Sequence, residues 1–147
     1  MSLRVVAIEL KIPDNAAFTA LVALRRLGLP VERVERSEIW RFEDAGDPKT
    51  FAARVRANQT IFNPNKHRLV ELERAVPRAG EAWIEKASEG NEVREHLGGK
   101  GIDGITASHR SVGWRLLGSN GAPAARETLA AAVTGLLCNP AIEKAVY

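Results

Sequence analysis

Near its end the chain reads Leu136-Leu137-Cys138-Asn139-Pro140-Ala141-Ile142-Glu143, and a shorter version of this stretch occurs earlier as Ile61-Phe62-Asn63-Pro64. A second pair of matching stretches precedes these two, Ser37-Glu38-Ile39-Trp40-Arg41 in the first half and Ser111-Val112-Gly113-Trp114-Arg115 in the second. The tryptophans lie 74 residues apart and the Asn-Pro pairs 76, so one loop is longer by two residues. Because solenoid repeats usually span roughly 20–50 residues, this spacing predicts two small αβ units joined head to tail.

The composition is that of a protein with a packed core. The 147 residues allow one ordinary domain or two very small ones, and 45% are hydrophobic. No apolar run approaches the roughly 20 residues that a membrane helix requires, and no signal-peptide core is found. Cys138 is the only cysteine, which excludes an internal disulfide and fits a reducing compartment. We therefore expect a cytoplasmic protein that does not bind a membrane.

The charge pattern argues against nucleic-acid binding. The net charge is only +3, and arginines alternate with glutamates in residues 31–36. Such interleaving is typical of a solvated strand face, whereas a phosphate-binding stripe gathers cations of one sign.

Hydrophobic periodicity predicts the elements of the first half. In order, we expect a strand, a helix, a long bent strand, a second helix and a closing strand, at residues 5–12, 15–27, 31–42, 48–62 and 67–72. The first helix is expected to bury a stripe made of Phe18, Leu21, Val22 and Leu24. Gly28 can take the positive φ that ends a helix. Asn63-Pro64 ends the second helix, because a residue before proline avoids the helical region.

The second half repeats this order, with expected elements at residues 82–87, 91–97, 105–117, 123–137 and 141–147. Leu129, Val133, Leu136 and Leu137 form the expected apolar face of its last helix. The predicted domains are residues 1–74 and 81–147, with 75–80 as the linker. The predicted fold class is α+β: two fused β-α-β-α-β units related by a pseudo-twofold axis, with an antiparallel sheet and helices packed on one side of it. Pairing two such units hides sheet edges that one unit would leave open.

No residue pattern predicts catalysis. The histidines, His67, His96 and His109, lack the spacing of metal ligands, and nothing in the sequence places a base beside Cys138. We therefore expect no catalytic residue, no metal site and no cofactor. The candidate interface or structural residues are the repeated ones: Trp40, Arg41, Trp114, Arg115, Asn63, Pro64, Asn139 and Pro140. For the tryptophans, core or inter-repeat packing is favoured over exposure on a partner-binding face, where tryptophan is enriched.

The order of elements and the Asn-Pro endings resemble the small, PurS-type subunit of phosphoribosylformylglycinamidine (FGAM) synthase. The closest stretch is 136–143, and looser matches are Ile8-Glu9-Leu10-Lys11, Leu24-Arg25-Arg26-Leu27-Gly28 and 61–64. Members of that family usually carry a Gly-Lys pair in the bent strand, where this chain has Ser37-Glu38 and Ser111-Val112. The resemblance covers the chain twice, as a tandem duplication of the family unit.

The resemblance implies a non-catalytic subunit of an ATP-dependent amidotransferase complex. Its partners would be the glutaminase and synthetase subunits of FGAM synthase, which it would bridge in de novo purine biosynthesis, and association with a second copy of the chain stays open. A different hypothesis is a regulatory αβ module that senses a small molecule bound between the two halves, since clefts between units are common ligand sites. A small enzyme that uses Cys138 or a histidine is the third hypothesis.

Overall fold

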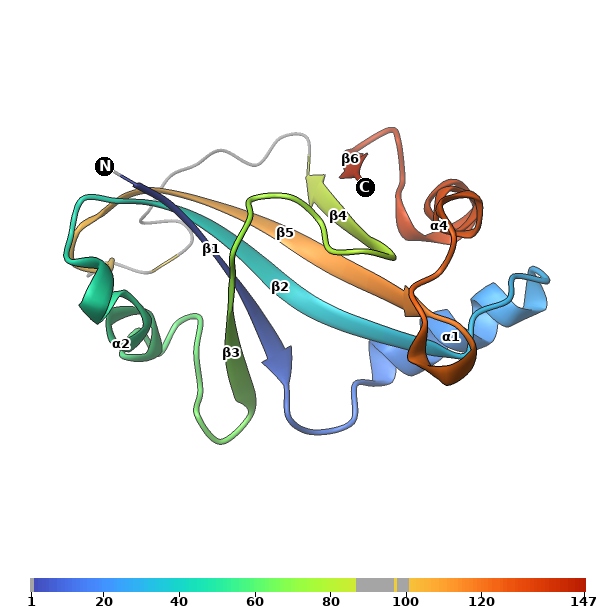
Figure 1. Cartoon of the computed structure of the whole chain (residues 1–147), viewed down its shortest axis with the longest axis horizontal. Helices are drawn as coiled ribbons and strands as arrows, with labels where there is room; N and C mark the ends of the chain where they lie inside the picture. Colours follow the sequence, from blue (N-terminus) through green and yellow to red (C-terminus); the bar gives the residue numbers. More distant parts are fainter. Residues whose placement is uncertain (1, 87–96, 98–100) are drawn as a thin grey trace. The chain divides into compact units, whose positions relative to one another are not determined.

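The structure is a computed structural model that describes residues 2–86, 97 and 101–147 (Figure 1). Its strands are β1 Ser2–Leu10, β2 Arg33–Asp44, β3 His67–Leu72, β4 Glu81–Lys86, β5 Ile105–Leu117 and β6 Glu143–Val146. Its α-helices are α1 Asn15–Arg26, α2 Phe51–Arg56 and α4 Arg126–Ala132. Two 3-10 turns, η1 Pro48–Thr50 and η2 Ser119–Gly121, and a π-helical turn, η3 Val133–Leu137, complete the described elements.

The strands form one six-stranded sheet in the order β3-β1-β2-β5-β4-β6. β1 pairs antiparallel with β3, from Val5 opposite Leu72 onward, and β4 pairs antiparallel with both β5 and β6. Just before β2, Glu32 N–H donates to the carbonyl of Leu117 at the end of β5. Just after β2, Ala45 N–H donates to the carbonyl of Gly104, which precedes β5. The start of each strand therefore lies beside the end of the other, so β2 and β5 also run antiparallel. The chain is therefore an α+β protein with an antiparallel sheet, as the sequence predicts.

The described residues cluster into two compact units. Unit 1 contains residues 2–12, 38–75, 97 and 101–110, and unit 2 contains 13–37, 76–86 and 111–147. β2 passes from unit 2 to unit 1 between Ser37 and Glu38, and β5 passes back between Arg110 and Ser111. Each unit thus combines segments from both halves of the sequence. The sequence division at residues 75–80 coincides with only one of the points at which the chain changes unit.

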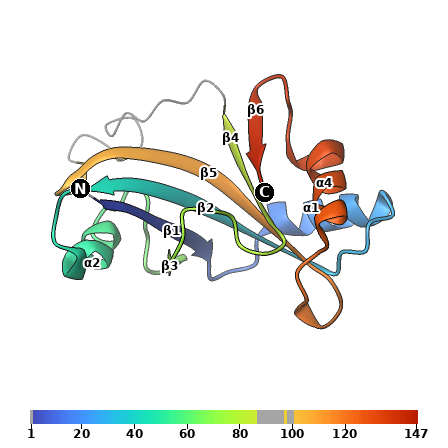
Figure 2. The same ribbon diagram turned by 45° about the horizontal axis from the view of Figure 1, so that its top comes forward.

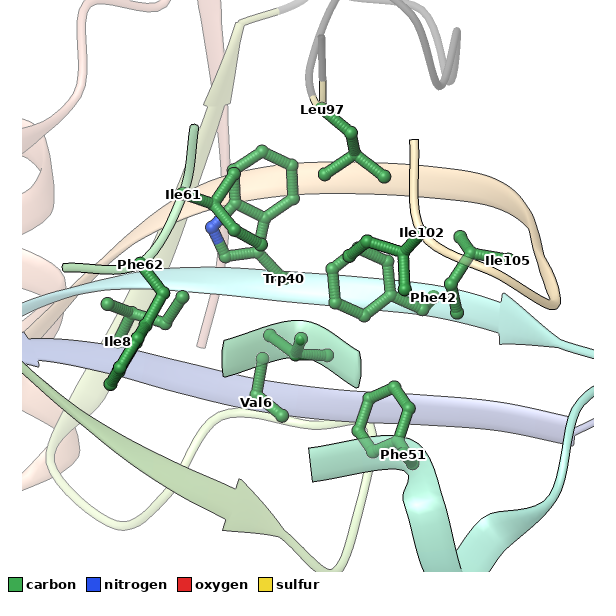
Figure 3. Close-up of a cluster of buried hydrophobic side chains, with 11 residues drawn as sticks. Val6, Ile8, Trp40, Phe42, Phe51, Ile61, Phe62, Leu97, Ile102 and Ile105 are labelled. Carbon is green, nitrogen blue, oxygen red and sulfur yellow. The ribbon is translucent and has the colours of Figure 1, made fainter. Parts of the chain in front are cut away.

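Unit 1 has an aromatic core, shown in Figure 3. The rings of Trp40 and Phe42 project from β2 and stack with centroids 5.8 Å apart, and Phe51 of α2 meets Phe42 edge-on at 6.0 Å. Val6 and Ile8 of β1 lie beside them. The other buried members of this cluster are Val55, Ile61, Phe62, Leu97, Ile102 and Ile105.

Unit 2 has an aliphatic core, formed where α1 and α4 cover part of the sheet. Both views show these two helices near one another (Figures 1 and 2). Leu24 of α1 and Leu129 of α4 pack in the same cluster as Leu116 of β5. The remaining buried members are Val31, Ala82, Ile84, Ala132, Val133 and Leu137. Each unit therefore has a hydrophobic core of its own.

Helix α1 begins and ends where the sequence predicts. The Asp14 carboxylate accepts hydrogen bonds from the N–H groups of Ala16, at 2.9 Å, and Ala17, which is how an N-cap residue satisfies the first turn. Gly28 follows the helix with φ +83°, the left-handed conformation that glycine adopts most readily.

Other expectations at the helices are wrong. Phe18, expected in the buried stripe of α1, is 67% exposed, and Leu136, expected on the apolar face of the last helix, is 42% exposed. The last helix begins at Arg126, because Pro123 instead forms an isolated bridge with Leu117. The second helix ends at Arg56, well before Asn63. Most of the helix expected at 91–97, together with His96, lies outside the described residues.

Candidate functional site

The repeated tryptophans each meet an arginine from the other half of the sequence. The guanidinium of Arg36 lies 5.9 Å from the ring centroid of Trp114 in unit 2, and that of Arg110 lies 6.0 Å from the ring of Trp40 in unit 1. Arg36 and Arg110 are themselves 74 residues apart, as the tryptophans are. The repeat therefore extends to these arginines, and each cation–π pair joins one half of the chain to the other.

The two tryptophans differ in burial. Trp40 is 1% exposed, and its Nε1 donates to the carboxylate of Glu38. Trp114 is half-buried and packs against the core of unit 2. Both settings agree with the packing interpretation, although one edge of Trp114 also borders a surface hollow.

The arginines beside these tryptophans are half-buried. Arg115 faces the carboxylate of Glu35 at 3.6 Å, while Arg41 follows Trp40 on β2. Neither observation assigns the two arginines to an interface.

The two Asn-Pro turns have the same hydrogen bonds. Asn63 N–H donates to Nδ1 of His67, and the Asn63 carbonyl accepts from the N–H groups of Lys66 and His67. Its Oδ1 accepts from Asn65 N–H at 2.9 Å, which closes an Asx turn.

Asn139 makes the matching set. Its N–H donates to the Glu143 carboxylate at 2.8 Å, its carbonyl accepts from the N–H groups of Ile142 and Glu143, and its Oδ1 accepts from Ala141 N–H. The two turns differ only in the group that accepts from the asparagine N–H. That group belongs to the fourth residue after the asparagine, and it is the imidazole of His67 in one turn and the carboxylate of Glu143 in the other. The two segments therefore adopt one local structure.

Both turns lie at the surface and lead into the edge strands of the sheet. Pro64, Asn139 and Pro140 are exposed, and Asn63 is half-buried. β3 and β6 begin four residues after Asn63 and Asn139, at His67 and Glu143, and they occupy the two ends of the strand order. A partner protein could reach all of these residues except the inner side of Asn63.

A buried carboxylate that the sequence does not reveal organises one end of unit 1. Asp44 has a fully buried side chain that accepts from Arg4 Nε at 2.8 Å and from both terminal nitrogens of Arg54. The hydrogen bonds from Arg54 hold the pKa of the Asp44 carboxyl well below its ordinary range, with help from Gly46 N–H and Arg4 against the cost of burial. Both guanidinium groups also lie over the ring of Phe51. We interpret this cluster as structural, because the Asp44 carboxylate and the two guanidinium groups are hydrogen-bonded to one another.

Cys138, His67 and His109 lie in the described part of the chain. Burial, followed by the charge of Glu143, raises the pKa of the Cys138 thiol, whereas an attacking cysteine needs a lowered pKa. Nδ1 of His67 accepts the Asn63 N–H, and His109 is exposed. Among residues 2–86, 97 and 101–147, no three or more His, Cys, Asp or Glu side chains group so that they could hold a metal ion.

Unit 2 has an apolar groove beside α1. It consists of two adjoining hollows of about 440 and 520 Å³, and Thr19, Ala23 and Leu136 line both. The other lining residues are Asn15, Ala16, Phe18, Ala20, Val22, Arg26, Leu27, Trp114, Gly135 and Leu137. The hydrophobic pattern of the sequence does not reveal this groove, because it predicts that Phe18 and Leu136 are buried in the core.

No helix in the described part of the chain is both long enough and apolar enough to cross a membrane. No protein-family model matches the chain, and no curated protein matches its sequence significantly.

Proposed function

We propose that this chain is a non-catalytic assembly subunit resembling the small, PurS-type subunit of FGAM synthase, in the form of a tandem duplication. It would bridge the glutaminase and the ATP-dependent synthetase subunits in de novo purine biosynthesis. In this proposal each half is a β-α-β-α-β unit with its helices on one side of the sheet, and a pseudo-twofold axis relates the halves.

The strand order supports the duplication. Read from one edge, the sheet has the third, first and second strands of the first half, followed by the second, first and third strands of the other half. Two copies of one unit that pair antiparallel through their second strands would give this mirrored order. The pairing also covers the edge of β2 and β5 that a single unit would leave unpaired.

The observation that carries the proposal is the pair of matching Asn-Pro turns. The turn at Asn139 belongs to the stretch that most resembles the PurS family, and the turn at Asn63 reproduces its hydrogen bonds at the equivalent place in the other half. The exchanged Arg36–Trp114 and Arg110–Trp40 pairs extend the equivalence to the bent strands. A duplicated PurS-type unit explains both features together.

Co-expression with the glutaminase and synthetase subunits from the same organism tests the proposal. We expect the chain to co-elute with both in size-exclusion chromatography when glutamine, ATP and the formylglycinamide ribonucleotide are present. A glutaminase–synthetase pair from another amidotransferase is the matched control and should elute without it. Failure to associate with the cognate pair under these conditions contradicts the proposal.

The sensing alternative has a different signature. A metabolite-binding module would be stabilised by an amino acid or a nucleotide with no partner protein present, and a thermal-shift screen measures this directly. The two hollows described above lie within unit 2 and are lined by α1 from the first half of the sequence and by Trp114 and Leu136 from the second half, so they are the surface that this alternative would use.

A further inference from the structure

Large apolar side chains gather at the groove on unit 2 instead of entering the core. Phe18 is 67% exposed, Leu27 55% and Leu136 42%, and all three line one hollow together with Val22. The second hollow continues this surface toward Trp114. Single exposed apolar residues are ordinary, but several that share one concave surface are typical of an interaction site.

A π-helical turn produces part of this exposure. Cys138 N–H donates to the carbonyl of Val133, five residues back, so the turn is one residue wider than in an α-helix. Within this turn Leu137 is buried and its neighbour Leu136 is exposed at the groove. Single π-turns are rare and occur frequently at functional sites, which makes the exposure of Leu136 a specific feature of the fold.

Gly135 lets the π-turn approach the end of α1. A Cβ at this position would come within 3.3 Å of Leu27 Cδ1, closer than most carbon contacts. The groove floor between the two segments is therefore formed partly by backbone. A floor of this kind leaves room for apolar side chains from outside.

The groove has a positive end. Arg26 is the only charged residue among those that line the two hollows, and Arg25 precedes it in the last turn of α1. α1 carries no acidic side chain, and no ion pair joins either arginine to another residue in the described part of the chain. Two cations at the C-terminus of a helix stabilise that helix, and they also attract carboxylates of a partner.

We propose that the groove of unit 2 binds an amphipathic helix of a partner protein. Its apolar side chains, spaced i, i+4 and i+7, would contact Phe18, Leu27 and Leu136, and its carboxylates would face Arg25 and Arg26. α1 has 12 residues, so it is about 18 Å long and can align with roughly three turns of the bound helix. This inference rests on the groove alone and does not depend on the FGAM synthase assignment.

A displayed library of amphipathic helices tests the proposal without a known partner. The library keeps an apolar stripe and randomises the flanking positions. Members that bind a Phe18→Ser variant are first removed, and the remaining members are then selected for binding to the whole chain. We expect the selected helices to carry Asp or Glu at one end. Their binding, measured by fluorescence anisotropy, should weaken at least tenfold with Phe18→Ser or Leu136→Ser.

Charge reversal supplies the second arm. When the library is instead selected for binding to an Arg25→Glu/Arg26→Glu variant, the selected helices should carry Lys or Arg in place of the acidic residues. The matched controls are Leu3→Ser and Val76→Ser, which remove apolar side chains of 58% and 50% exposure away from the groove and should leave binding unchanged. All of these variants change exposed residues, so urea unfolding should show that each remains folded.

Three results would overturn the inference. The first is a selection that yields no helix sensitive to Phe18→Ser. The second is selected helices whose charge does not follow the charge of residues 25 and 26. The third is a dimer of the chain that dissociates with Phe18→Ser, since a second copy would then be the occupant of the groove.

Discussion

At the scale of single residues, Asp44 is a buried charge in unit 1 that depends on its partners. Its carboxylate lies in a fully buried position and joins β2 to Arg4 of β1 and Arg54 of α2. An aspartate at the end of a strand is unremarkable in sequence, and nothing local identifies partners 40 residues before it and 10 after it. The cluster could not be predicted because it depends on the packing of α2 and on the position of β1 in the sheet.

We predict that Asp44→Asn lowers the free energy of unfolding by about 3 kcal/mol at neutral pH. Removing one partner of a buried ion pair leaves the other charges uncompensated, and Arg4 and Arg54 keep only limited contact with water. Urea denaturation at pH 7 measures the change. Glu73→Gln is a suitable control, because Glu73 is an exposed carboxylate of the same unit.

The ion pairs of Asp44 also predict how the free energy of unfolding changes with pH. Because the folded-state pKa of Asp44 is lowered, its stabilisation is complete above the ordinary carboxyl pKa of about 3.9 and is lost as the pH falls below that value. The wild-type chain should therefore lose stability more steeply between about pH 4 and pH 2 than the Asp44→Asn variant does. Parallel curves for the two proteins would contradict the assigned role of Asp44.

At the scale of elements, sequence patterns located the strands better than the helix faces. β3 and β5 have the predicted boundaries, 67–72 and 105–117. Both lie between strong punctuating residues, Asn63-Pro64 before β3 and glycines on either side of β5. The Asx turn at Asn63 explains why the start of β3 could be predicted, since it is set by local hydrogen bonds.

The faces of α1 and the last helix were partly wrong because apolar residues surround more than one side of each. In α1 the sequence offers Phe18, Leu21, Val22 and Leu24, and only Leu24 is fully buried. In the last helix a regular 3.6-residue period places both Leu136 and Leu137 inward. The π-turn changes this period after Val133, and a hydrophobicity pattern contains no signal for a change of that kind.

We predict that alanine substitutions separate these two leucines. Leu137→Ala should lower the free energy of unfolding by about 2–5 kcal/mol, because the side chain lies in the core of unit 2. Leu136→Ala should cost about 1 kcal/mol or less, because the side chain is largely outside it. Urea denaturation of the two variants is the measurement. Equal losses would indicate that the last turn is an ordinary α-helix with both leucines buried.

At the scale of the whole molecule, the repeat read from sequence and the compact units divide the chain differently. The repeat separates residues 1–74 from 81–147, whereas each unit takes segments from both halves. α1 belongs to the first half of the sequence, yet its Leu24 lies in the core of unit 2 with Leu116 and Leu129. Ile102 and Ile105, from the second half, lie in the core of unit 1. Sequence similarity between segments identifies which segments are alike, and it does not identify which segments pack together.

This exchange of segments predicts the behaviour of the chain when it is cut at Ala75 and Val76, where one unit gives way to the other. Neither fragment contains a complete core, since each unit would lose members of its buried cluster. We expect fragments 1–75 and 76–147 to show no cooperative unfolding as separate monomers. When mixed, they should form a one-to-one complex with the circular dichroism spectrum of the intact chain. A fragment that folds cooperatively as a monomer would mean that each half completes its own core, and the exchange of segments between units would be wrong.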